Sequence, residues 1–126
     1  MPTAALSFPD FLQGLREPGS RTALSPALLA SALELPVQDL ASLAKVHRNT
    51  LQLAPSSPKV QSAIRDVLRV LSAAHELTGE IDRAVFWFRN HPIPDFGHRT
   101  AMQLVEMGKV QAVIDYIESR SAGATG

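Results

Sequence analysis

The sequence contains no cysteine, carries no net charge and has few aromatic residues. Without cysteine, the chain can form neither a disulfide framework nor a metal site with thiolate ligands. Its twelve basic and twelve acidic residues cancel, which excludes a histone-like polycation and an acidic disordered tail. Because only one Tyr, one Trp and five Phe are present and no alternating pattern supports strands, a β-sheet core is not indicated.

Long apolar runs are also missing. No stretch approaches the roughly 20 apolar residues of a membrane-spanning helix, and the first twelve residues lack a basic segment followed by a long apolar one. We therefore expect a cytoplasmic protein with no membrane partner. A length of 126 residues leaves room for one core or two small packed units.

Apolar residues recur three and four positions apart, which is the period of an α-helix. Serine–proline pairs at 25–26 and 57–58 are typical helix starts, because serine caps a helix and proline fits its first turn. The predicted helices cover residues 8–15, 26–34, 36–44, 48–53, 58–77, 80–90, 99–107 and, as a short last helix, 110–117. A tail of small residues, 119–126, is expected to be mobile in the unbound protein.

Charge is unevenly distributed along the chain. Residues 45–69 contain five basic residues and one acid, a net charge of +4, whereas residues 1–44 and 70–126 each carry −2. A phosphate backbone would therefore be attracted to the middle segment, with an affinity that falls as salt increases.

The middle segment also has a pattern suited to DNA. Residues 40–51 (LASLAKVHRNTL) combine an apolar helix, a short turn and a second helix that starts Arg-Asn-Thr, and they resemble the helix-turn-helix of Xre-type regulators. In such motifs the first turn of the second helix enters the major groove. Arg48 can bond guanine, and Asn49 and Gln52 can bond adenine, although the prolines that follow make this helix short. The predicted DNA-binding residues are Lys45, His47, Arg48, Asn49, Thr50, Gln52 and Lys59, with Leu51 as an apolar anchor.

A more specific pattern occupies residues 79–108. Trp87 to Thr100 (WFRNHPIPDFGHRT) has an aromatic helix end, a segment that two prolines keep extended, a glycine turn and a threonine helix start, and Gly108 then ends the next helix. This pattern is similar to the toxin-binding domain shared by the MbcA, ParS and Xre antitoxins. Ala101 departs from it, because the family usually has proline there and a more rigid helix start.

Helical periodicity predicts an all-α fold, and together with the resemblance it divides the chain into three parts. These are an N-terminal arm (1–21), which lies outside the resemblance, an Xre-like helix-turn-helix domain (22–78) that ends in a long helix, and a small helical toxin-binding domain with the mobile tail (79–126). The resemblance further implies an antitoxin that blocks the active site of a RES-type toxin, an enzyme that degrades NAD. The antitoxin would act as a homodimer, form a larger hetero-oligomer with its toxin, and repress its own operon by binding operator DNA.

The implied toxin-binding residues lie in the last third of the chain. Arg99 can pair with a carboxylate of the partner, and Tyr116 can anchor the contact. The full set is Gly97, His98, Arg99, Thr100, Gly108, Lys109, Tyr116 and Arg120. The three aromatic residues at 86–88 are interpreted instead as core, and Gly97 and Gly108 primarily as turn and helix-stop residues.

Neither catalysis nor a cofactor is predicted. The four histidines lack the spacing of a metal site, and Ser25, Ser57 and Thr100 precede helices, where a hydroxyl serves as a cap rather than a nucleophile. Two other functions remain open: a stand-alone regulator or adaptor without a cognate toxin, and a purely structural helical module whose Arg48 helix never contacts DNA.

Overall fold

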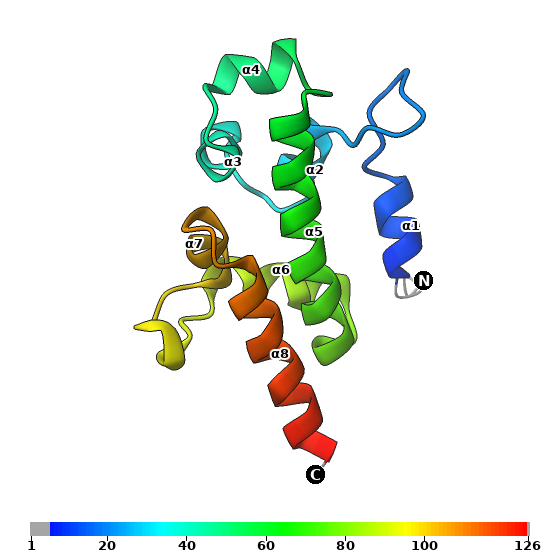
Figure 1. The fold of residues 1–126 in the computed structure, drawn as a ribbon. Helices are drawn as coiled ribbons and strands as arrows, with labels where there is room; N and C mark the ends of the chain where they lie inside the picture. The colour runs from blue at the N-terminus through cyan, green and yellow to red at the C-terminus, as the bar shows by residue number, and fades with distance from the viewer. Residues whose placement is uncertain (1–5, 126) are drawn as a thin grey trace. The chain divides into compact units, whose positions relative to one another are not determined.

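The computed structural model describes residues 6–125, with side chains described as far as Ser121 (Figure 1). Helices account for nearly all of its regular structure, and no strand other than two isolated β-bridges occurs in that range, which confirms the predicted all-α class. The elements are α1 (Phe8–Gln13), α2 (Pro26–Ala32), α3 (Val37–Ala44), α4 (Arg48–Leu53), α5 (Pro58–Thr78), α6 (Ile81–Asn90), the 3-10 helix η1 (Pro94–Phe96), α7 (Ala101–Glu106) and α8 (Val110–Thr125).

The chain folds into two compact units. We call residues 9–65 the N-terminal unit and residues 66–125, together with the described residues up to Phe8, the C-terminal unit. These limits differ from the sequence-based boundaries at residues 21 and 78. The difference arises because α5 contributes its first turns to one core and its remaining turns to the other.

The first described residues do not form a separate arm. Phe11 and Leu15 are buried, the Ser25 N–H donates to the Leu15 carbonyl at 2.6 Å, and Arg16 forms an isolated antiparallel bridge with Leu24. Residues 9–21 are therefore part of the N-terminal unit, whereas residues 1–5 of the predicted arm lie outside the described range.

Each unit has its own apolar core. In the N-terminal unit, α2, α3 and the start of α5 bury their inward stripes, which include Leu29, Leu33, Leu40, Val60 and Ile64. In the C-terminal unit, α7 contacts both α6 and α8, and the most buried side chains, two of them from the rest of α5, are Val67, Leu71, Phe88, Leu104 and Ile117.

A series of polar side-chain contacts on the surface links α8 to α5. Arg69 donates to the Gln111 side chain at 3.0 Å, and Gln111 donates in turn to Asp115 at 2.9 Å. Arg69 also lies 3.9 Å from the Asp66 carboxylate. Because these side chains are exposed or half-buried, their contacts add little to the free energy of unfolding and serve mainly to orient the two helices.

Several local predictions need correction. The last helix is not short: α8 continues to Thr125, so residues 119–125 are helical rather than a separate tail. The segment after Pro92 is not fully extended, because residues 94–96 form a 3-10 turn with proline at its first position. The helix predicted over 99–107 begins at Ala101.

The lengths and compositions of the helices can be compared with those of a membrane-spanning helix. In the described range, no single helix is long and apolar enough to span a bilayer. Among the described helices, only the pair α2 and α3, taken together, is long and apolar enough for a span, and its two helices are bent by 117° relative to each other.

Candidate functional site

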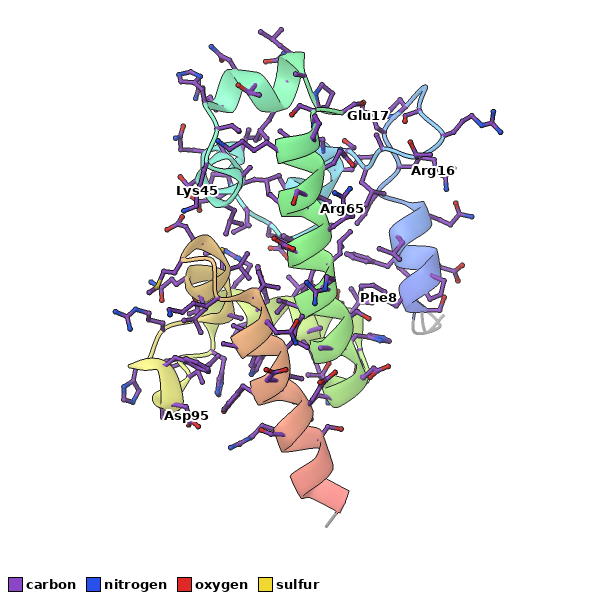
Figure 2. The ribbon with its side chains drawn as sticks, in the orientation of Figure 1. Phe8, Arg16, Glu17, Lys45, Arg65 and Asp95 are labelled. Carbon is purple, nitrogen blue, oxygen red and sulfur yellow. The ribbon has the colours of Figure 1, made fainter. Side chains whose placement is uncertain are left out.

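Two helices joined by a short turn lie in the N-terminal unit, where the sequence predicts a helix-turn-helix. α3 ends at Ala44 and α4 begins at Arg48, so a three-residue turn joins them (Figure 1). Lys45 reverses the chain with a left-handed backbone (φ 56°), and the Val46 N–H donates to the Ala41 carbonyl at 3.1 Å. Lys45 lies at this turn, as Figure 2 shows. The turn therefore has the length that helix-turn-helix motifs require.

The exposed side chain of His47 caps the start of α4. Its Nδ1 atom accepts a hydrogen bond from the Asn49 N–H at 3.1 Å, which satisfies one of the unpaired donors at the helix start. Leu51 is buried and anchors the helix, as predicted. The side chains of Arg48, Asn49 and Gln52 are exposed, and Thr50 is half-buried.

The exposed side chains of α4 border a groove in the same unit. The groove has a volume of about 400 Å³ and an apolar floor, and it is lined by Pro26, Ala27, Val37, Arg48, Asn49, Leu51 and Gln52. Three of the predicted DNA-binding residues therefore share one surface. Lys45 and Lys59 are also exposed; Lys59 lies apart from this groove, near the start of α5.

The predicted toxin-binding turn is a closed and rigid loop in the C-terminal unit. The Ile93 N–H donates to the Arg99 carbonyl, and the His98 N–H donates to the Ile93 carbonyl, both at 2.9 Å. Gly97 and His98 have left-handed backbones, with φ of 67° and 65°. Since only glycine adopts this conformation without strain, His98 carries backbone strain in an exposed loop. Figure 2 places Asp95 in the same loop.

Arg99 and Thr100 both stabilise the end of this loop. The Nη1 atom of Arg99 donates to the Phe96 carbonyl at 3.2 Å. Thr100 forms a capping box with Gln103, in which each side chain accepts from the other residue's N–H, at 3.2 and 2.9 Å. The predicted capping role of Thr100 is confirmed, and alanine at position 101 still permits a well-capped helix.

The loop contacts α8 through an aromatic pair. The ring of Phe96 meets the ring of Tyr116 edge-on, with centroids 5.9 Å apart, and the Arg120 guanidinium lies 5.6 Å from the centroid of Tyr116. The structure thus places Tyr116 and Arg120 beside Phe96, the residue that precedes the 97–100 turn. Gly108 and Lys109 lie at the other end of α8, roughly 16 Å from Arg120 along the axis at the standard helical rise.

Sequence reasoning misplaced one aromatic residue. Phe88 is buried, in agreement with its interpretation as core, and Trp87 is half-buried, but Phe86 leaves 68% of its surface exposed. The signal was available, because Phe86 and Phe88 are about 200° apart around a helix and cannot both face one core.

The described residues contain no group of three or more His, Cys, Asp or Glu placed to hold a metal ion. Among their exposed surfaces, that of α4 carries Arg48, Asn49 and Gln52, and that of the 93–99 loop carries Asp95, His98 and Arg99.

Comparison with known proteins supports one of these surfaces. Residues 73–123 match the family model described as the antitoxin Xre/MbcA/ParS C-terminal toxin-binding domain. The match runs from the last turns of α5 into α8 and includes every predicted toxin-binding residue. No curated protein and no solved structure matches the chain significantly.

Proposed function

We propose that this chain, whose residues 73–123 belong to the Xre/MbcA/ParS family of antitoxin toxin-binding domains, neutralises a RES-type toxin that degrades NAD. The family match is the observation that carries the proposal. The chain would act by binding, with the C-terminal unit docked on the toxin so that substrate cannot reach the toxin's active site.

The geometry of the C-terminal unit suits such a contact. The loop at 93–99 is held by its own backbone hydrogen bonds, so little conformational entropy is lost when a partner binds it. Arg99 and Arg120 are exposed beside an aromatic pair, and arginine and aromatic side chains are enriched where protein interfaces contribute most binding energy.

We further propose that the N-terminal unit binds the operator of its own operon as a repressor. The support is the three-residue turn before α4, the burial of Leu51 and the exposure of Arg48, Asn49 and Gln52. Residues 45–65 contain four basic residues and no acid, so a phosphate backbone is attracted to this unit.

The proposal includes a cytoplasmic location, a homodimer and a larger hetero-oligomer with the toxin. Dimerisation would place two copies of α4 on the two half-sites of a palindromic operator. Light scattering of the isolated chain and of its complex with the toxin tests both assemblies.

Co-purification with the product of the adjacent gene tests the main proposal. A stable complex in which the partner's NAD consumption is suppressed supports an antitoxin. Failure to bind a RES-domain partner, together with salt-dependent binding to the upstream DNA, would favour the stand-alone regulator instead.

A further inference from the structure

Phe86 is the one exposed aromatic residue among the seven in this chain. It leaves 68% of its surface in contact with solvent, whereas the other six aromatic side chains, all within the described range, are buried or half-buried. Exposing a phenyl ring forgoes the free energy of burying it, and aromatic rings are among the side chains that contribute most to binding in protein interfaces.

The helix α6 holds Phe86 away from its own core. Ala84, Val85 and Phe88 face inward and are buried. Phe86 lies on the opposite face, one turn from Asp82 on one side and from Asn90 on the other. The Asn90 side-chain amide donates to the Phe86 carbonyl at 3.1 Å, which holds the Asn90 side chain on the same face of α6 as the ring.

Other residues in and next to α6 add polar and charged side chains to the surface near Phe86. Trp87 stacks on His91, with ring centroids 5.8 Å apart and planes 18° from parallel. Arg83 lies 3.4 Å from the Glu80 carboxylate. Asp82 has no ion pair within the described residues and is free to pair with a cation of a partner. We call Asp82, Phe86 and Asn90 the α6 face.

The identity of the partner follows from where this face lies. α6 falls inside residues 73–123, the stretch that matches a toxin-binding domain. In the described part of that stretch, the exposed large hydrophobic residues are Leu77, Phe86 and Met107, and Phe86 is the largest and most exposed of them. Aromatic side chains surrounded by polar groups are the usual centres of binding energy in protein interfaces.

We propose that Phe86 is a principal anchor for the toxin. The ring enters an apolar pocket on the toxin, a cationic or hydrogen-bond donor group of the toxin pairs with Asp82, and the Asn90 amide lies at the rim. This inference rests on the proposed function and adds to it a contact residue that lies outside the 97–100 turn and α8. Because α6 fixes the backbone of Phe86, the ring is held in place before binding.

The test compares two substitutions of exposed hydrophobic residues. Phe86→Ala removes the proposed anchor, and Leu53→Ala removes a residue of the N-terminal unit whose side chain is 81% exposed. The dissociation constant of the full chain for the RES-domain product of the adjacent gene is measured by calorimetry, beginning with the wild type. Because both side chains are exposed, both variants are expected to retain the wild-type circular dichroism and melting temperature.

We expect Phe86→Ala to weaken toxin binding by about 30-fold or more, as for interface hot spots, and Leu53→Ala to leave it within about twofold. Phe86→Arg, which keeps a long side chain but adds a charge, is expected to weaken binding at least as much. Unchanged affinity of Phe86→Ala, or an equal loss in Leu53→Ala, would overturn the inference while leaving the proposed function intact. A wild-type chain that does not bind the toxin would overturn both.

Discussion

The side-chain amide of Gln61 forms a reciprocal pair of hydrogen bonds with the backbone of Leu24. Its Nε2 atom donates to the Leu24 carbonyl at 2.8 Å, and its Oε1 atom accepts from the Leu24 N–H at 2.9 Å. Nε2 also donates to the Pro55 carbonyl at 2.7 Å. One buried glutamine on α5 thus holds both the segment before α2 and the loop that follows α4.

Replacing Gln61 with leucine tests the importance of these bonds. The change leaves a backbone N–H and two carbonyls without partners in a partly buried site, so we expect the free energy of unfolding to fall by about 2–4 kcal/mol. Urea denaturation measures it, with Ser62→Ala as the control on the exposed side of the same helix. A loss below about 0.5 kcal/mol would mean that water or relaxed loops replace the bonds.

The strained backbone of His98 gives a prediction of opposite sign. His98 has φ 65°, whereas His91, which is also exposed, has φ −81°. We expect His98→Gly to raise the free energy of unfolding by about 0.5–1 kcal/mol, because glycine adopts the left-handed region without strain. His91→Gly should lower it by about 1 kcal/mol, since glycine gains freedom in the unfolded state and the stacking on Trp87 is lost.

Thermal unfolding of the two glycine variants measures this difference directly. If both variants lose stability equally, the left-handed conformation of His98 carries no strain.

Local signals in the sequence identified most of the helices. The serine–proline starts at 25–26 and 57–58 and the left-handed stop at Gly108 depend on residues close together in the chain, so they could be recognised without tertiary structure. Burial of Leu51 followed from its place on the predicted helix in the same way.

What the sequence could not supply depends on contacts between distant residues. The division of α5 between two cores, the attachment of Leu15 to Ser25, and the bonds from Gln61 to Leu24 all join segments that no short motif connects. The outward position of Phe86 differs from the prediction for another reason. The prediction groups three consecutive aromatic residues as one apolar cluster, whereas a helix divides them between its faces.

Arg48 and Lys59 should affect DNA binding in different ways. If Arg48 contacts a guanine, Arg48→Ala should weaken operator binding by about 1–3 kcal/mol and leave binding to unrelated DNA nearly unchanged. Lys59→Ala should weaken both and reduce the slope of log affinity against log salt by about 1. Arg21→Ala is the control, because Arg21 is exposed in the same unit but lies outside the basic segment.

Fluorescence anisotropy on both DNAs at several salt concentrations distinguishes these effects. Equal losses on operator and unrelated DNA for Arg48→Ala would assign that residue to phosphate rather than to a base.

Charge reversal at Arg99 should act on the toxin and not on DNA. Arg99 is exposed at the end of the 93–99 loop, and Arg99→Glu should weaken toxin binding roughly tenfold by placing like charges together at the interface. Operator affinity should stay the same. The matched control, Arg21→Glu, makes the same charge change in the N-terminal unit, and calorimetric titration of the toxin should give it the wild-type affinity. A toxin affinity unaffected by Arg99→Glu would remove Arg99 from the interface.

The most direct test of the antitoxin role is the rate at which the purified RES-domain partner consumes NAD, measured with increasing amounts of this chain. We expect consumption to fall to the background level as the chain saturates the partner, and residues 66–126 of the chain to carry this effect. NAD consumption that stays constant at saturating concentrations of a folded wild-type chain would contradict the antitoxin role.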